Sequence, residues 1–459
     1  MAFEHAVVVG AGIGGLLSAA SLAPRFARVT IVERDELPAG AAHRRGVPQG
    51  EQMHALLTIG QDAFEELLPG IREAWADAGA AWFDSTRDVA SFSSQGWTAR
   101  GPSEAWTFGI RRIVLESVVR ERVRAIPNVA IVQGTVTGLH ASDDSRRVTG
   151  VTVRASGPSV IEADLVVDSS GRTSHAVQWI ADLGYEPPAE HEIVSDIVYS
   201  TVVVRLPGDA LRTDVRGILA PPTPADPRGA VLLPCDDGLH QIVAVAQNAS
   251  RAPADREEFL TQLGGATTPI VAEVARRAEF VGDPKPFKIR GTRRVRWEDM
   301  DTRPEGFVVI GDAVLALNPI YGQGMSVAAV EALAMRDEVA RTDADDATGL
   351  AGRIQDSFRT TLDFVFDSGL RSDAHYPATT VHGVEAPPLP KSRVLGAVAT
   401  EDWKVAVAMR YVSHGFSAEP LQRPEIQARV RARMASKRPA RPHDPAVIPK
   451  PFAGTPLPR

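Results

Sequence analysis

The chain has 459 residues, 50 basic and 57 acidic side chains, a net charge of −7 and one cysteine. With 44% hydrophobic and 23% charged residues, its composition is that of a globular protein of two or three folding units. The acidity argues against a nucleic-acid-binding protein, and the lone Cys235 excludes an intrachain disulfide and a cysteine-rich zinc site. We therefore expect a cytoplasmic protein without a metal site.

The first predicted strand and helix enclose a glycine-rich turn. The apolar run Ala6–Val9 predicts a strand buried on both faces, and Leu16–Leu22 predicts a helix. Between them Gly10, Gly12 and Gly15 fit the pattern G-x-G-x-x-G. The clustered glycines and the acidic start of the chain argue against a membrane span and a secretory signal.

A second predicted strand, Val29–Val32, ends at Glu33, about 20 residues after the glycines. In such a unit the glycines permit a tight turn and a close approach to a pyrophosphate, which the helix N-terminus attracts. The Glu33 carboxylate can accept hydrogen bonds from ribose hydroxyls and would repel the 2′-phosphate of NADP. The pattern predicts a dinucleotide site, and the alternative is a glycine-rich turn that only packs.

Two further strands lead into glycine turns. Asp164–Asp168 is followed by Ser170–Gly171, and Gly306–Ile310 is followed by Gly311–Asp312. A strand that ends in Gly-Asp places a carboxylate at the sheet edge where ligands of α/β folds bind. The segment Asn318–Ala334 then predicts a turn and a helix, whose first backbone N–H groups favour an electron-rich ligand.

In order and spacing, these motifs resemble those of class A flavoprotein monooxygenases, which include aromatic hydroxylases and squalene-type epoxidases. The resemblance covers most of residues 1–340 and is greatest to bacterial natural-product epoxidases and hydroxylases, such as polyether epoxidases. It implies an α/β fold, with a Rossmann-type FAD-binding domain, an inserted β-sheet substrate domain as in p-hydroxybenzoate hydroxylase, and C-terminal helices. It also implies FAD as cofactor, with NADPH, NADH or a separate flavin reductase as electron donor.

The resemblance also implies which residues contact the cofactor. Glu33 would hold the adenosine ribose, Arg112 would support FAD, and Asp312 would bond the ribityl chain or the pyrophosphate. The catalytic positions at the reactive face of the flavin would be Pro319, Gly324, Met325 and His54. The full set of implied cofactor contacts is Gly10, Gly12, Gly14, Gly15, Glu33, Arg34, Arg45, Val47, Gln49, Arg112, Gly311, Asp312, Gly322, Gly324 and Met325.

The sequence departs from the family pattern at several positions. Ser170–Gly171 stands where many relatives have an Asp-Gly pair linked to NADPH binding, which leaves direct use of NADPH open. Gln52 replaces a second histidine found in the subgroup, and Val314 and Leu315 occupy the region where many relatives carry another histidine.

The activity that the resemblance implies is insertion of one oxygen atom from O₂, through a flavin C4a-hydroperoxide, into a small hydrophobic natural-product intermediate by epoxidation or hydroxylation. One alternative is a flavin-dependent reductase or dehydrogenase of similar fold that acts on a polyene or prenyl substrate. Another is a flavin-binding carrier without turnover. A disulfide reductase is excluded, because Cys235 has no partner and only one dinucleotide motif is present. A homodimer is left open.

The pattern of strands and glycine turns predicts a discontinuous FAD-binding domain with the substrate domain inserted between its pieces. β-Branched runs at 197–206, 229–233 and 241–247 predict the substrate sheet. The predicted parts are FAD-binding residues 1–75, 105–175 and 290–345, substrate-domain residues 76–104 and 176–289, a helical region 346–435, and a proline-rich extended tail 436–459.

Five residues are candidates to contact substrate. Tyr199 and Arg205 lie on one face of their predicted strand, because an even separation places side chains on the same side. Trp97, Trp106 and Phe108 could line the pocket, although a place in the core is the commoner fate of an aromatic side chain.

Two other features have a functional and a structural interpretation. His54 could guide a proton at the flavin, or it could be a histidine whose hydrogen bonds serve structure alone. Arg293, Arg294 and Arg296 could dock the phosphates of a nicotinamide cofactor, but we favour a solvated strand edge for them.

Overall fold

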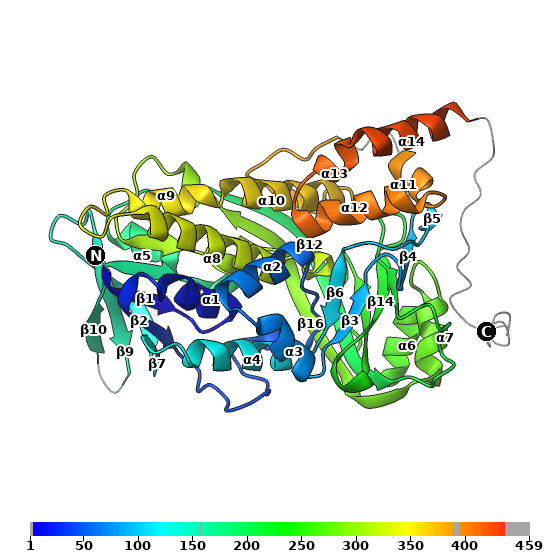
Figure 1. Cartoon of the computed structure of the whole chain (residues 1–459), viewed down its shortest axis with the longest axis horizontal. Helices are drawn as coiled ribbons and strands as arrows, with labels where there is room; N and C mark the ends of the chain where they lie inside the picture. The colour runs from blue at the N-terminus through cyan, green and yellow to red at the C-terminus, as the bar shows by residue number, and fades with distance from the viewer. Residues whose placement is uncertain (1–2, 156–157, 389–393, 437–459) are drawn as a thin grey trace.

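The computed structural model describes residues 3–155, 158–388 and 394–436, which form an elongated molecule (Figure 1). Apart from Ser436, the predicted proline-rich tail lies outside the described residues. A small parallel sheet occupies the left of the view, a large sheet extends to the right, and the C-terminal helices run along the upper edge. In the described part of the chain, no helix is both long and apolar enough to cross a membrane.

The parallel sheet has five strands in the order β17-β11-β1-β2-β7. Its strands are nearly continuous apolar runs because helices cover them, as is typical of parallel sheets. They come from separated stretches of the chain: β1 (Phe3–Val9), β2 (Phe26–Glu33), β7 (Val129–Gln133), β11 (Leu165–Asp168) and β17 (Phe307–Val309). The helices around this sheet are α1 (Ile13–Leu22), α2 (Thr58–Leu67), α3 (Ile71–Asp77), α4 (Arg112–Arg124), α5 (Ala176–Asp182) and α8 (Gly324–Arg341).

Two small antiparallel sheets flank this region. One has the order β10-β9-β8, and the other pairs β3 with β6. Their bounds are β3 (Ala81–Asp84), β6 (Trp106–Gly109), β8 (Thr135–Ala141), β9 (Val148–Arg154) and β10 (Pro158–Glu162).

The large sheet has nine strands in the order β18-β16-β12-β15-β14-β13-β4-β5, with β19 paired to β12. The pair β13–β4 is parallel, whereas the other pairs are antiparallel. The strands are β4 (Val89–Ser93), β5 (Gly96–Trp97), β12 (Glu190–Arg205), β13 (Gly217–Ala220), β14 (Arg228–Pro234), β15 (His240–Ala246), β16 (Glu279–Val295), β18 (Leu315–Ala316) and β19 (Thr380–His382).

The two faces of the large sheet have different partners. Val202, Leu232 and Ile242 belong to the face that packs on α6 (Arg256–Gly264) and α7 (Ile270–Arg277). The opposite face, which we call the inner face, carries five residues in cross-strand register: Ser91, Leu219, Val231, Val243 and Thr201. Alternation along each strand separates the two sets.

Helices form most of the C-terminal region, as the sequence predicts. The short strand β19 was not expected there; it adds to one end of β12, pairing Ile193 with Val381. The helices are α9 (Leu350–Ser357), α10 (Arg359–Asp373), α11 (Val394–Ala399), α12 (Trp403–Gly415), α13 (Glu419–Gln422) and α14 (Pro424–Ala435).

The arginines at the end of β16 form ion pairs instead of a solvated edge. Arg294 is fully buried and donates to Glu298, and also to Asp363 of α10 at 3.1 Å. Arg293 pairs with Glu190, and Arg296 with Asp299 and Asp363. These pairs leave no free cationic patch for cofactor phosphates, so both sequence interpretations of the cluster are corrected.

Replacing Arg294 by methionine is expected to lower the free energy of unfolding by about 3 kcal/mol, because the buried Glu298 would lose its closest partner and keep only Arg296, at 3.4 Å. Arg293→Met is the matched control: its pair with Glu190 is partly exposed, so the loss is expected to be below about 1 kcal/mol. Urea denaturation measures both. Equal losses would contradict the assignment of Arg294 as the buried link between β16 and α10.

Candidate functional site

The three glycine turns meet at the carboxyl edge of the parallel sheet. The N–H of Ser169 donates to the Val9 carbonyl at 3.0 Å, and the N–H of Ile310 donates to the Asp168 carbonyl at 2.9 Å. These bonds continue the strand pairing past the strand ends, where side chains and backbone groups become available to a ligand. Segments about 150 residues apart in sequence, at 9, 168 and 310, are thus joined.

The β1–α1 turn has one closed and one open side. A side-chain Cβ at Gly15 would lie 1.9 Å from the Gly10 carbonyl oxygen, so only glycine allows this packing. At Gly14 a Cβ would lie 2.6 Å from the Ser169 hydroxyl oxygen. A Cβ at Gly12, in contrast, would meet nothing within 4 Å. Since Gly12 directly precedes α1, the open space faces the unpaired N–H groups of the first helical turn.

Glu33 lies beside this turn, at the end of β2. Its carboxylate is buried and accepts hydrogen bonds from the N–H groups of Ala11 at 2.7 Å and Asp35 at 3.0 Å. Arg44 donates to it at 3.2 Å. These contacts fix the carboxylate next to the helix N-terminus.

Arg44 is the arginine that contacts this turn, although the family resemblance pointed to its neighbour Arg45. Its guanidinium donates to Glu116 at 2.9 Å and to the Ala11 carbonyl at 2.9 Å, in addition to Glu33. Arg45 and Arg34, the predicted contacts, are both exposed. Both arginines of the Arg44–Arg45 pair lie in a loop, where no periodicity tells which side chain points inward.

Arg112 lies in the same buried network. It pairs with Glu116 at 2.7 Å, one turn along α4, and Arg120 lies 3.7 Å from the same carboxylate. Burial raises the pKa of Glu116, but Arg112 and Arg44 outweigh this and hold it below its ordinary value. The carboxylate therefore stays ionised and orients the arginines around the turn.

The loop after Arg44 runs to the large sheet. Val47 is buried and Gln49 half-buried. Gln52, found where the subgroup often has histidine, accepts from the Thr201 hydroxyl at 2.7 Å and donates to the Lys285 carbonyl at 3.0 Å. The Nδ1 atom of His54 lies 2.9 Å from the Gln52 carbonyl. Burial, and then the charge of Arg112, lower the pKa of His54 to about 4, so its imidazole is neutral at pH 7.

Asp312 follows β17 and is the carboxylate that the Gly-Asp motif predicts at this edge. Burial raises its pKa, and the nearby charges of Arg172 and Arg112 oppose that rise. In the described part of the chain, no donor is hydrogen-bonded to the Asp312 carboxylate. Arg172, which the sequence analysis did not select, is held by the carbonyls of Gly291 and Leu317, both at 2.8 Å.

The turn before α8 is held from both ends. The Asn318 side chain accepts from the Ile320 N–H at 3.1 Å, and Gly322 has the left-handed φ of +63° that glycine adopts without strain. The first backbone bond within the helix joins the Val327 N–H to the Gln323 carbonyl. The N–H groups before it, which include those of the predicted contacts Gly324 and Met325, therefore remain available to a ligand. The segment between β17 and α8 also contains the other predicted cofactor and catalytic positions of this region, Gly311, Pro319 and Gly322.

Asp373, at the end of α10, is the buried anchor of this turn. It accepts hydrogen bonds from the Tyr321 hydroxyl at 2.5 Å and from the Asn318 amide at 3.0 Å. It also accepts from Gln247, beyond the end of β15, at 3.2 Å. One carboxylate thus joins the turn, the large sheet and the C-terminal helices. No local motif marks Asp373, because its partners lie at least 50 residues away in sequence.

Tyr199 lies on the inner face of the sheet, next to this turn. It is 7% exposed and packs in a cluster with Ile197, Val243, Val245 and Ile289. Burial raises the pKa of its hydroxyl well above the ordinary value. Four partly exposed residues border the cluster, and two of them, Met53 and Ile320, come from the loops at the parallel sheet: Met53, Val231, Phe287 and Ile320.

The other predicted substrate contacts lie elsewhere. The Arg205 side chain is 62% exposed beside Glu279, about 20 Å along β12 from Tyr199 at about 3.3 Å per residue. Trp97 packs with the cluster on the opposite face of the sheet. Phe108 is in core contact with the rings of Trp75 and Trp82, and Trp106 is 40% exposed. Strand alternation alone could not tell which face of the sheet meets the loops.

The arrangement suits FAD. The space before Gly12 with the free amides of α1 accommodates a pyrophosphate, and Glu33 lies where a ribose would be bound. The Asp312 carboxylate and the free amides of α8 offer an acceptor and donors to the rest of the cofactor. Among the described residues, no group of three or more His, Cys, Asp or Glu side chains is placed to hold a metal ion.

Comparisons with known proteins agree with this arrangement. The sequence model of the family described as FAD dependent oxidoreductase matches residues 6–269. A curated relative, Protein Rv3254 of Mycobacterium tuberculosis (strain ATCC 25618 / H37Rv), is 29% identical over 348 residues, which are 72% of this chain and 71% of that protein.

Solved structures share the fold at low sequence identity. A flavoprotein/dehydrogenase from Cytophaga hutchinsonii superposes with a TM-score of 0.62 at 15% sequence identity, and the match covers 93% of this chain and 96% of that chain. The flavin-dependent brominase Bmp2 has a TM-score of 0.60 at 14% identity, with 93% and 92% covered. PqsL, a probable FAD-dependent monooxygenase from Pseudomonas aeruginosa, has a TM-score of 0.59 at 16% identity, and the match covers 82% of this chain and 97% of that chain. These likenesses confirm the predicted fold class.

Gly12→Ala and Gly15→Ala form a matched pair. Gly15→Ala is expected to lower the free energy of unfolding by about 3 kcal/mol, because its Cβ collides with the Gly10 carbonyl. Gly12→Ala is expected to change it by less than about 1 kcal/mol but to weaken FAD binding at least about tenfold, since the methyl group enters the open space. Urea denaturation and FAD titration separate the two effects. Unchanged FAD affinity in Gly12→Ala would refute the placement.

Asp373→Asn is expected to weaken FAD binding by about tenfold, because an amide cannot accept all three hydrogen bonds and the turn loosens. Flavin fluorescence titration gives the dissociation constant. Asp367→Asn is the control, since Asp367 is an exposed acid on the same helix. If both variants bind FAD alike, Asp373 does not position the turn.

Proposed function

The chain belongs to the FAD-dependent oxidoreductase family, and from this premise we propose that it is a monooxygenase. Its proposed reaction transfers one oxygen atom of O₂ to a small hydrophobic organic substrate, by epoxidation or hydroxylation of an electron-rich carbon centre. The second oxygen atom leaves as water, and two electrons come from NADPH or NADH, directly or through a separate flavin reductase. The fold shared with PqsL, described as a probable FAD-dependent monooxygenase, supports this choice.

The residues proposed to hold the cofactor are those at the carboxyl edge of the parallel sheet. The α1 amides and Gly12 would hold the pyrophosphate, Glu33 the ribose, and Asp312 the linking chain. FAD, when bound, supplies the redox chemistry by which O₂ is activated. The N–H groups of Gly324 and Met325 would stabilise negative charge on a reduced ring, as backbone donors do in an oxyanion hole.

One observation carries the proposal: an apolar sheet face directly adjoins the cofactor turn. Ile320, within that turn, and Met53, from the loop after Arg44, pack with Tyr199 on the inner face. An oxygen transfer needs substrate and cofactor to share one water-poor space, because water competes for reactive intermediates. The inner face offers apolar walls there, partly exposed at Val231 and Phe287.

The titratable groups around this space suit oxygen transfer without acid–base machinery. His54 is neutral at pH 7, with its Nδ1 at 2.9 Å from the Gln52 carbonyl, so a proton on Nδ1 is held and Nε2 is left as the accepting nitrogen. Burial and then Asp236 raise the pKa of the buried Cys235 to about 12, so its thiol stays protonated at neutral pH.

The electron donor is proposed not to bind at the site beside Glu33, which is assigned to the adenosine of FAD. The Glu33 carboxylate disfavours a 2′-phosphate there, and Arg293, Arg294 and Arg296 are occupied by ion pairs. Neither feature provides a second dinucleotide site. Comparing turnover with NADH, NADPH and an added flavin reductase identifies the donor.

Isotope labelling tests the proposed reaction. FAD-loaded protein is supplied with a reduced nicotinamide, or with a flavin reductase, under ¹⁸O₂ and a library of apolar alkenes and phenols. We expect a product that carries one ¹⁸O atom, with none from H₂¹⁸O in the reverse experiment. Turnover that continues without O₂, with no label in the product, would instead show a reductase or dehydrogenase. Gly12→Ala serves as the cofactor-deficient control.

A further inference from the structure

Arg410, on α12, reaches from the C-terminal helices to the large sheet. Its guanidinium donates to the Ser91 hydroxyl on β4 at 3.2 Å. Ser91 belongs to the inner face, in register with Leu219, so the arginine head lies at that face. The side chain is partly accessible, although the surrounding protein is dense enough that burial lowers its pKa. Arg410 therefore lies at the inner face with its side chain only partly exposed.

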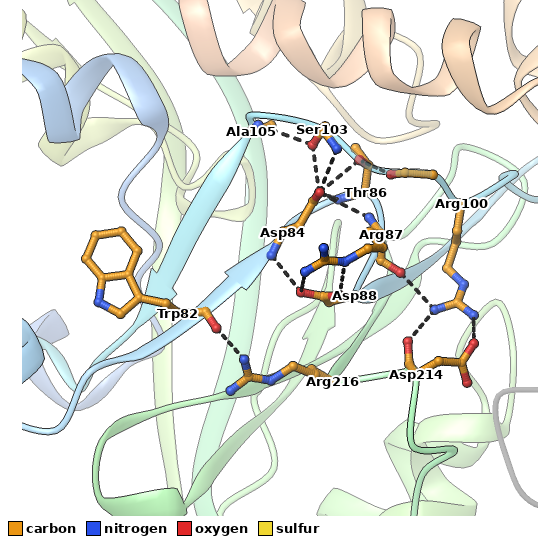
Figure 2. Close-up of polar contacts among 11 residues, drawn as sticks. Trp82, Asp84, Thr86, Arg87, Asp88, Arg100, Ser103, Ala105, Asp214 and Arg216 are labelled. Carbon is orange, nitrogen blue, oxygen red and sulfur yellow. Dashed lines mark hydrogen bonds and ion pairs between the residues drawn. The ribbon is translucent and has the colours of Figure 1, made fainter.

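No carboxylate of the described residues pairs with Arg410. The nearby acid Asp84 has its own partners, accepting from the backbone N–H groups of Thr86, Arg87 and Ser103 (Figure 2). Other arginines around this network are paired: Arg87 with Asp88, and Arg100 with Asp214. Among the described residues, His414 lies one turn along α12 and is affected by the charge of Arg410, and its pKa of about 3 leaves it neutral.

An unpaired guanidinium in such surroundings costs free energy of folding. Of its five N–H donors, the described residues use one, toward Ser91. The remaining donors form a planar fork whose geometry matches a carboxylate. A ligand carboxylate would supply the negative charge that Arg410 lacks as a partner, and this pairing would contribute to the free energy of binding.

The inner face connects Arg410 to the cofactor turn. The cross-strand row runs from Ser91 through Leu219, Val231 and Val243 to Thr201. Thr201 donates to Gln52 and lies two residues from Tyr199 on the same face of β12. Four strand spacings of about 4.8 Å give a length of about 19 Å. The middle of the row is aliphatic, and its two ends are polar.

We propose that Arg410 and Ser91 form an anion subsite that binds the carboxylate of an elongated, otherwise apolar acid, whose far end reaches the cofactor turn. This inference rests on the proposed function, because it takes the inner face as the place of the substrate. It narrows the substrate class from hydrophobic molecules in general to amphipathic carboxylic acids. The acid is held by its head, and the chain lies along Leu219, Val231 and Val243.

The test measures binding to the FAD-loaded protein by isothermal titration calorimetry, with myristate, decanoate and methyl myristate as probes. The wild type is expected to bind myristate at least about tenfold more tightly than its methyl ester, because a charge-assisted pair is lost in the ester. Decanoate is expected to bind more weakly than myristate, since it covers less of the row. Arg410→Met is expected to abolish the preference for the acid over the ester.

Two variants control for charge and folding. Lys404→Met removes an exposed cation from the same helix and should leave the preference intact, whereas Arg410→Lys should keep part of it. The Tm of Arg410→Met should equal or exceed that of the wild type, because a partly buried guanidinium without a carboxylate partner among the described residues is removed. A lowered Tm would point to a structural role, which would contradict the subsite.

Equal affinity for myristate and its ester, unchanged affinity for myristate in Arg410→Met, or no binding of any acid would each overturn the proposal. The measurement needs no turnover, so it is separate from the test of the reaction. Preference for the acid in a protein that never incorporates ¹⁸O would refute the monooxygenase and retain the subsite.

Discussion

The contact between Gly15 of α1 and the carbonyl of Gly10 is the constraint on which the site depends. No side chain fits between them, since a Cβ at Gly15 would lie 1.9 Å from that oxygen. The contact lets α1 pack closely against β1, with its N-terminus aimed along the carboxyl edge of the sheet. The ends of β11 and β17 pair into the same edge, so the Glu33 and Asp312 carboxylates follow strands that end at one edge of the sheet.

Features encoded by short stretches of sequence were predictable. The glycine turn and the strands beside it follow from local patterns, because backbone freedom at glycine and periodic burial are local properties. Gly10, Gly12 and Glu33 were placed by spacing, and the structure brings them together. The fold class followed from the order of these motifs, and the shared fold of known flavoproteins confirms it.

Features that depend on long-range contacts were not predictable from spacing. Arg44 and Arg45 are neighbours in a loop, and only its burial between Glu33 and Glu116 distinguishes Arg44. Asp373 acts on a turn more than 50 residues away. Trp97 was a candidate to contact substrate, but it packs on the face of the sheet that α6 and α7 cover, which no local pattern indicates.

We propose that the carboxyl edge of the parallel sheet holds FAD so that the reactive end of the cofactor meets the inner face of the large sheet. A crystal structure of the FAD-loaded protein measures this most directly. We expect the pyrophosphate at the N-terminus of α1, beside Gly12, and the flavin ring between the turn at Pro319–Gly322 and Tyr199. A flavin ring that points away from the inner face, or FAD bound elsewhere on the chain, would contradict it.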